Sequence, residues 1–175
     1  MAGRAGARLI DDNVVFTVAD PPDWEEIWPI VRDVIGTGDT YPYPPDMSEA
    51  EARSIWMKEG PMEATFVARM GETIVATAYV KPNQPGLGDH VANAGWMVAP
   101  DRQGQGLGRR FAEYVIDQAR ERGYLGMQFN SVVSTNTGAV ALWESLGFEI
   151  VGTVPEAFRH SLVGLVPIHV MYRRL

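Results

Sequence analysis

The chain has 175 residues, 46% of them hydrophobic, and a formal charge of −7 from 15 Lys and Arg against 22 Asp and Glu. This size and composition predict one globular domain, and the acidic balance disfavours a nucleic-acid partner, because binding to a phosphate backbone depends on clustered cations. The absence of cysteine excludes disulfides, a cysteine nucleophile and thiolate metal ligands, and no apolar run is long enough to cross a membrane as a helix.

Residues 1–12 are small and polar, and we expect them to form a flexible arm ahead of a single domain over residues 13–175. They lack the apolar stretch of a signal peptide, which favours a cytoplasmic protein without a membrane partner. Beyond them, hydrophobic periodicity and turn residues predict the elements of the domain. In chain order these are a strand at Val14–Val18, helices at Trp24–Ile35 and Ser48–Glu59, strands at Ala64–Met70, Thr73–Lys81 and Val91–Val98, a helix from Leu107 to Gly123, a strand at Tyr124–Val133, a helix from Thr135 to Gly147, and strands at Phe148–Val154 and Pro167–Tyr172.

This order mixes antiparallel hairpins with a strand–helix–strand crossover, which predicts an α/β or α+β fold with a mixed sheet. The crossover joins Val91–Val98 to Tyr124–Val133, so we expect these two strands to be parallel neighbours.

Three glycines at alternate positions, Gly104, Gly106 and Gly108, lie between a predicted strand and an amphipathic helix. Glycine allows a positive φ and a close approach of the backbone to a ligand, and the free N–H groups at the start of a helix favour a phosphate. Arginines add positive charge to the same segment: Arg102, Arg109 and Arg110. The pattern therefore predicts an anion site, with a plain glycine turn and solvated arginines as the alternative.

Two nucleotide-binding motifs do not fit this segment. A Walker loop needs Gly-Lys-Ser/Thr, and Gly108 is followed by Arg109-Arg110. A dinucleotide fingerprint needs a third glycine where Arg109 stands, and an acidic residue about twenty positions later, where the chain has Asn130.

The segment Gln103–Gly108 instead matches the pattern Q/R-x-x-G-x-G/A, and a second signature runs from Asn136 through Trp143 to Gly147-Phe148. Together the two motifs resemble the GCN5-related N-acetyltransferase (GNAT) superfamily, whose members bind acetyl-CoA. The resemblance implies a splayed mixed sheet with helices on both faces, acetyl-CoA as cosubstrate, no metal, and a homodimer. Three distant histidines without ligand spacing also argue against a metal site: His90, His160 and His169.

The resemblance also implies which residues hold acetyl-CoA. The backbone of Met97 and Val98 would pair with the pantetheine arm, and an N–H near Met97 would face the thioester carbonyl as an oxyanion donor. Asn136 would bond near the pantetheine or the thioester, with a plain helix-start residue as the alternative. Backbone N–H groups would hold the pyrophosphate at Gln103, Gly104, Gln105, Gly106, Leu107, Gly108 and Arg109.

Two positions depart from the common GNAT pattern. Trp143 stands where many members have a tyrosine that protonates the departing thiolate, so we interpret it as a wall of the thioester tunnel or as core, and the general acid stays unassigned. Asn93 stands where many members have a glutamate base. We expect Asn93, with Asn130 across the cleft, to orient the acceptor; the alternative is that both are satisfied core polar groups.

Asn93-Ala94-Gly95, Phe129-Asn130 and Leu142-Trp143 are similar to the yeast-type acetyltransferases that detoxify proline analogues such as azetidine-2-carboxylate. In that subgroup the two matching asparagines hold the small cyclic amino acid. The prediction is therefore an N-acetyltransferase in which the amine of a small molecule, an amino acid or a proline analogue attacks the thioester directly. Two alternatives stay open: acetylation of a protein N-terminus or lysine, and a CoA-binding module without catalysis.

Overall fold

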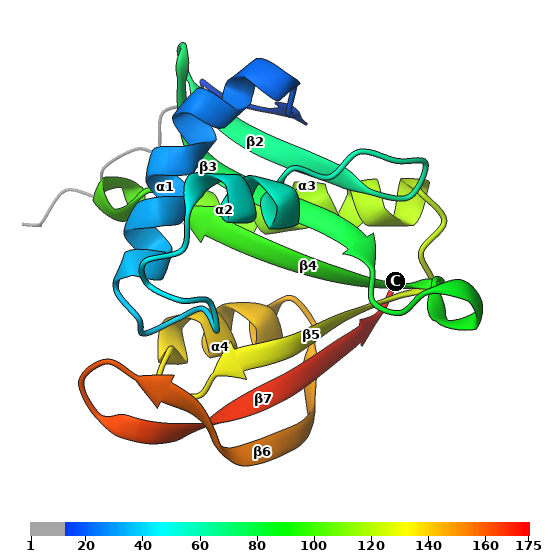
Figure 1. The fold of residues 1–175 in the computed structure, drawn as a ribbon. Coiled ribbons are helices and arrows are strands. Elements are labelled where there is room, and N and C mark those ends of the chain that lie inside the picture. Colours follow the sequence, from blue (N-terminus) through cyan, green and yellow to red (C-terminus); the bar gives the residue numbers. More distant parts are fainter. Residues whose placement is uncertain (1–12) are drawn as a thin grey trace, which may run out of the picture.

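The computed structural model describes residues 13–175, and the predicted N-terminal arm lies outside that range. Seven strands form one mixed sheet in the order β1-β2-β3-β4-β5-β7-β6 (Figure 1). The strands are β1 Val14–Val18, β2 Ala64–Met70, β3 Thr73–Pro82, β4 Val91–Val98, β5 Gly126–Val133, β6 Glu149–His160 and β7 Gly164–Arg174. The helices are α1 Trp24–Gly36, α2 Glu49–Trp56, α3 Leu107–Glu121 and α4 Thr137–Ser145. This is the predicted α/β class with a mixed sheet.

The helices cover both faces of the sheet because side chains alternate along each strand. On β3, Ala78 and Val80 belong to the core that α3 and α4 share with the sheet, whereas Tyr79 belongs to the core under α1 and α2. Figure 1 shows α1 and α2 in front of the strands and α3 behind them. The two faces of the sheet are therefore different environments.

Three elements differ clearly in extent from the prediction. Helix α2 begins with the expected capping box of Ser48 and Glu51, but it ends at Trp56 because Met57 is already extended. The last two strands are longer than the predicted runs and form a hairpin that projects from the sheet (Figure 1). Pro167 has no Cα partner on β6 and falls where the register shifts, so the missing N–H interrupts no ladder bond there.

Strands β4 and β5 are parallel, as the crossover predicts, but they pair over only three residues, from Val91↔Gly126 to Asn93↔Gln128. Beyond Asn93 both strands continue for several residues without pairing, and in Figure 1 they separate toward the side where α4 lies. The sheet is therefore splayed at this point, which leaves one edge of β4 without a strand neighbour.

Candidate functional site

The free edge of β4 carries backbone groups that face the gap between β4 and β5. The N–H of Leu125 donates to the carbonyl of His90 at 2.9 Å, which places the carbonyl of His90 on the β5 side. Successive residues of a strand turn their N–H and C=O groups to opposite edges. The backbone groups of Ala94, Trp96 and Val98 therefore face the gap as well.

A hydroxyl from the loop between α1 and α2 occupies this edge. The hydroxyl of Tyr41 donates to the carbonyl of Trp96 at 2.6 Å and accepts from the N–H of Trp96 at 3.0 Å. Burial, reinforced by the neighbouring Tyr43, raises the pKa of Tyr41 far above its usual value. The phenol is therefore protonated at neutral pH and able to donate.

The backbone of Met97 does not face the gap, in contrast to the prediction that it binds the pantetheine arm and the thioester. It is the Cα partner of Thr77 on β3, with no register shift along this pair of strands, so its N–H and C=O face β3 rather than the gap. Its side chain is 2% exposed in the core under α1 and α2. Of the two neighbours whose N–H groups face the gap, Trp96 and Val98, only Trp96 lines the pocket beside it. Val98 does present its backbone to the gap, with Gln103 Nε2 3.4 Å from its carbonyl oxygen.

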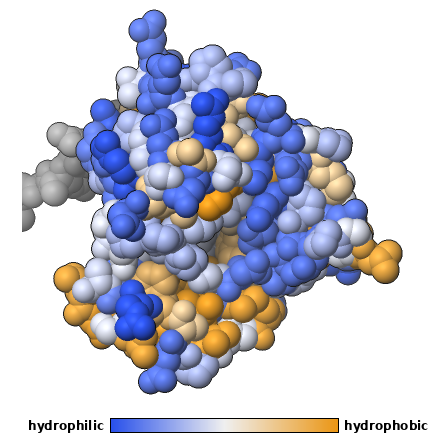
Figure 2. Space-filling model, in the orientation of Figure 1, coloured by the Kyte–Doolittle hydropathy of each residue, from blue (hydrophilic) through white to orange (hydrophobic). Residues whose placement is uncertain are grey.

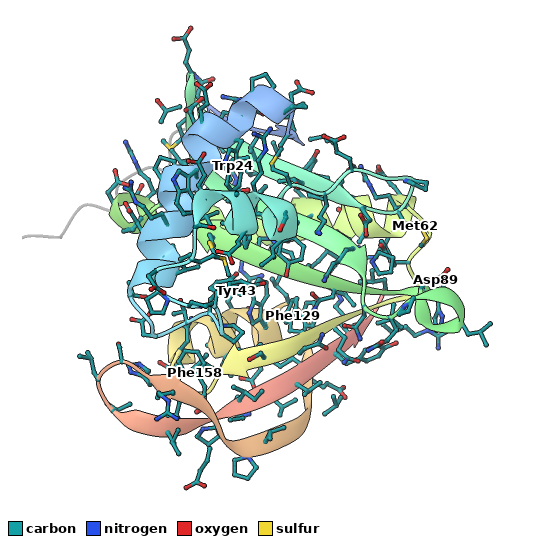
Figure 3. All side chains as sticks on the ribbon, viewed as in Figure 1. Trp24, Tyr43, Met62, Asp89, Phe129 and Phe158 are labelled. Carbon is teal, nitrogen blue, oxygen red and sulfur yellow. The ribbon has the colours of Figure 1, made fainter. Side chains whose placement is uncertain are left out.

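A pocket of about 270 Å³ opens beside this edge, lined by the loop before α2 and by residues of β3, β4, β5 and α4. Tyr43 from the loop and Phe129 from β5, both labelled in Figure 3, line it. Gly95 also lines it and leaves space for the ring of Tyr79, because a Cβ at Gly95 would lie 2.8 Å from that ring. The pocket therefore contains hydroxyl and amide groups within an aromatic wall.

The structure brings the two predicted asparagines to this pocket. Asn93 Nδ2 donates to the carbonyl of Gln128 at 3.0 Å, and no hydrogen bond within the described residues uses its Oδ1. Asn130 is held on both sides: its Nδ2 donates to Asn83 Oδ1 at 2.7 Å, and its Oδ1 accepts from Gln128 Nε2 at 2.8 Å. Asn93 thus offers a free acceptor, whereas Asn130 is part of a chain of side-chain amides.

Trp143 is at once a wall of the pocket and part of the core. It is 8% exposed, and its ring centroid lies 4.9 Å from that of Trp96 and 4.7 Å from that of Phe129. Trp96 and Phe129 also meet edge to face, with their centroids 5.4 Å apart. The three rings connect β4, β5 and α4 across the gap, so they limit its depth.

The glycine turn lies outside the pocket, at the start of α3. Gly104 and Gly106 have φ of +73° and +77°, and Gly106 is the N-cap residue of the helix. Within the described residues, no hydrogen bond uses the N–H groups of Gln103 to Gly106, and those of the first helical turn, Leu107 to Arg109, have no partner within the helix. This run of N–H groups fits an anionic diphosphate.

The three arginines of this segment each contact a different part of the protein. Arg109 bonds to Ser145 on α4 and pairs with Glu113, with Nη1 and Oε1 3.4 Å apart. Arg110 lies over the ring of Phe16, 5.9 Å from its centroid, and Arg102 pairs with a neighbouring aspartate. Backbone N–H groups are therefore the main donors that the turn presents.

Asn136 is the N-cap residue of α4, one position after the predicted Thr135: its Oδ1 accepts from the N–H of Ala139 at 3.2 Å. It also lines the pocket. The side-chain oxygen of Asn136 therefore caps the helix, as the helix-start interpretation predicts. Its Nδ2 makes no hydrogen bond within the described residues.

Three further groups complete this pocket. The Oγ1 of Thr40 and the Nε1 of Trp96 are buried there without a hydrogen-bond partner, and Lys81 is the one charged residue among the described residues that line it. No local pattern marks these residues, because strand register and the path of the loop bring them together. Across residues 13–175, no group of three or more His, Asp or Glu residues could hold a metal ion.

The model of the acetyltransferase (GNAT) family matches residues 24–148. N-acetyltransferase aca1 of Schizosaccharomyces pombe is 30% identical over 139 residues, which cover 71% of this chain and 66% of that protein. The ribosomal protein bS18-alanine N-acetyltransferase of Escherichia coli strain K12 is 47% identical over 51 residues, which cover 29% of this chain and 34% of that enzyme. A third or more of each curated relative thus lies outside its match.

Among solved structures, a GCN5-related N-acetyltransferase from Kribbella flavida is 44% identical, with a TM-score of 0.89 over 94% of this chain and 99% of that one. In the part of the chain that the structure describes, no helix is both long and apolar enough to cross a membrane. With a family model that matches most of the chain and a structural likeness over 94% of it, the chain belongs to the acetyltransferase (GNAT) family.

Proposed function

We propose that the protein transfers the acetyl group of acetyl-CoA to the amine of a small molecule, an amino acid or a proline analogue. The observation that carries the proposal is the end of β4–β5 pairing at Asn93, which leaves the N–H of Trp96 facing a pocket. The glycine turn supports acetyl-CoA binding, because its free N–H groups suit a diphosphate.

The chemistry is a direct transfer in which the amine nitrogen bonds to the thioester carbon, the C–S bond breaks, and CoA leaves as a thiolate. The N–H of Trp96 would stabilise the oxyanion, and one such donor contributes about 3 kcal/mol. The hydroxyl of Tyr41 holds that N–H in this structure, so the thioester oxygen would have to replace it.

The proton balance of this transfer needs no carboxylate. The described lining contains no Asp or Glu, so the amine must arrive neutral or lose its first proton to water, and the proton that its nitrogen loses as the amide forms passes to water or to the departing thiolate. At the other end, a thiol of pKa about 8.5 is an adequate leaving group without an acid. Asn93 Oδ1, free in the hydrogen-bond pattern, would accept from the amine and orient it. Catalysis would then rest on positioning and oxyanion stabilisation.

The size of the pocket favours a small acceptor. Its volume of about 270 Å³ is at the lower limit of ligand pockets, which run from roughly 300 to 1,000 Å³. Tyr41, Tyr43 and Trp143 enclose it with rigid rings. A compact amino acid such as a proline analogue suits this space.

A second candidate function is acetylation of a protein N-terminus. It is favoured by the 47% identity to the bS18-alanine N-acetyltransferase over 51 residues. A CoA-binding module without catalysis is the third candidate, because the pocket has no carboxylate base.

Thiol release from acetyl-CoA distinguishes the three functions. The panel contains azetidine-2-carboxylate, proline, alanine, spermidine and a peptide with an N-terminal alanine. We expect turnover with the small amino acids, and a tenfold or greater loss of kcat/KM in Asn93→Ala with unchanged affinity for CoA. Turnover of the peptide alone would establish the second function, and CoA binding without any turnover the third.

We also propose that the protein is a cytoplasmic homodimer. The hairpin of β6 and β7 exposes large apolar side chains, and Figure 2 shows hydrophobic residues gathered over it. These are Ile150, Val151, Val154, Leu162, Val163 and Leu165. Light scattering should give twice the chain mass of 19.3 kDa, and Val154→Asp should shift the protein toward the monomer; a monomeric wild type would refute the proposal.

A further inference from the structure

Lys81 is an isolated charge at the acceptor side of the pocket. It is the Cα partner of Asn93 in the antiparallel β3–β4 pair. Side chains of such partners lie on the same face of the sheet, with Cβ atoms roughly 4.5–5.5 Å apart. The residue that would orient the amine thus has a lysine as its immediate neighbour.

The ammonium of Lys81 has no partner of its own. Within residues 13–175 it makes no ion pair, whereas several arginines do. Lys58, the only other lysine of the chain, donates to the carbonyl of Ser54 at 3.0 Å. The other described residues around the pocket are uncharged. In a protein of net charge −7, one unpaired cation in an otherwise neutral pocket selects for a negative group on the ligand.

We propose that Lys81 binds the carboxylate of the acceptor, and that the acceptor is therefore a free amino or imino acid. The inference rests on the proposed acetyl transfer and names the residue that selects, among small amines, those with a free carboxylate. Asn93 Oδ1 accepts from the amine while Lys81 pairs with the carboxylate. The adjacency of the two side chains matches an amine and a carboxylate that share one carbon atom.

The same charge disfavours other acceptors. A polyamine or a basic peptide would bring a second cation close to Lys81, where like charges repel. The N-terminal alanine of a protein has an amide in place of the carboxylate, so the ammonium would gain no partner. Lys81 also favours the neutral form of the amine, which is the form that attacks, because a nearby cation lowers the pKa of an amine.

Kinetics with a matched pair of acceptors test the proposal. Azetidine-2-carboxylate and azetidine-2-carboxamide differ only in the charged group. We expect the wild type to prefer the acid at least tenfold in kcat/KM. In Lys81→Gln the KM for the acid should rise tenfold or more and the preference should disappear, with kcat changed less than threefold. Lys81→Arg should keep the preference, and Lys58→Gln should behave as the wild type.

Calorimetric titration of the same acid and amide into the CoA-bound protein separates this inference from the proposed function. Tighter binding of the acid that is lost in Lys81→Gln supports Lys81 even if no acetylation is observed, a result that would refute only the transfer. Equal binding of acid and amide by the wild type, an equal loss of both in Lys81→Gln, or turnover confined to the peptide would each overturn the role of Lys81.

Discussion

At the residue scale, the pocket is built from groups that donate and accept hydrogen bonds but do not take a proton at neutral pH. The resemblance places Asn93 where many GNAT members have a glutamate base, and its amide donates and accepts hydrogen bonds but does not take a proton. Burial raises the pKa of both Tyr41 and Tyr79 above the usual value of a phenol. Such a site acts by orienting its partners, and the acceptor amine itself then sets the pH dependence of the reaction.

Tyr41→Phe tests the hydroxyl that holds the edge of β4. The variant leaves the N–H and C=O of Trp96 without their partner, so we expect the free energy of unfolding to fall by about 1–3 kcal/mol in urea denaturation. Because the hydroxyl competes with the thioester, the KM for acetyl-CoA should not rise. A higher KM with a lower kcat would instead show that Tyr41 contacts the thioester; Tyr43→Phe is the matched control.

At the scale of elements, two helix starts supply residues that we propose bind acetyl-CoA. Helix α3 begins at a glycine turn whose positive φ values expose a run of N–H groups. Helix α4 is preceded by its N-cap residue Asn136, which both caps the helix and lines the pocket. Each feature is local in sequence, and each places backbone or amide donors beside the gap in the sheet.

Gly106→Asp tests the turn. Aspartate is strained at a φ of +77° and adds a negative charge where the phosphates would bind. We expect the Kd for CoA, measured by calorimetry, to rise at least tenfold. The control is Gly123→Asp after α3, which has a similar φ of +89°. Equal CoA affinity of Gly106→Asp and the wild type would refute the phosphate cradle.

Variants of Asn136 separate its two roles. Asn136→Ala removes the N-cap of α4 and should lower the free energy of unfolding by about 1 kcal/mol. Asn136→Ser should restore that stability, because serine is also a good N-cap residue. If the free Nδ2 contacts acetyl-CoA, the KM for acetyl-CoA stays raised in the serine variant. Full recovery of the KM would leave Asn136 as a cap alone.

At the scale of the whole molecule, helices cover both faces of the sheet, and the separation of β4 from β5 leaves one gap in it. One face packs α3 and α4 over a continuous aliphatic and aromatic core. The other carries α1 and α2 and buries phenol groups with Trp56. Tyr41 and Tyr79 belong to this second core and also line the pocket. The protonation state of these buried phenols therefore affects the stability of the fold.

Alkaline unfolding measures this link. In the unfolded chain Tyr41 and Tyr79 ionise near pH 10, whereas in the folded protein burial raises the pKa of both. Above about pH 10 the unfolded state binds fewer protons than the folded state, so the free energy of unfolding should fall by about 1 kcal/mol per pH unit for each phenol. Below pH 10 these groups should have no effect. Tyr41→Phe should show a shallower decline, and identical slopes in both proteins would contradict the assignment.

The sequence by itself determined the order of elements, the parallel crossover, the glycine turn and the pocket positions of Asn93 and Asn130. These features depend on local periodicity, on turn residues and on motif spacing. All three are properties of residues that lie close together in the chain. The end of α2 and the length of the last two strands were missed, because tertiary packing sets where such elements stop.

Only the tertiary structure decided which edge of β4 faces the gap, and hence that Trp96 rather than Met97 presents its N–H there. It also decided that Lys81 lies beside Asn93 and that Tyr41 reaches the free edge. The physical reason is strand register: a shift of one residue turns every backbone group and side chain to the other side. Pairing between distant segments sets that register, and no single segment encodes it.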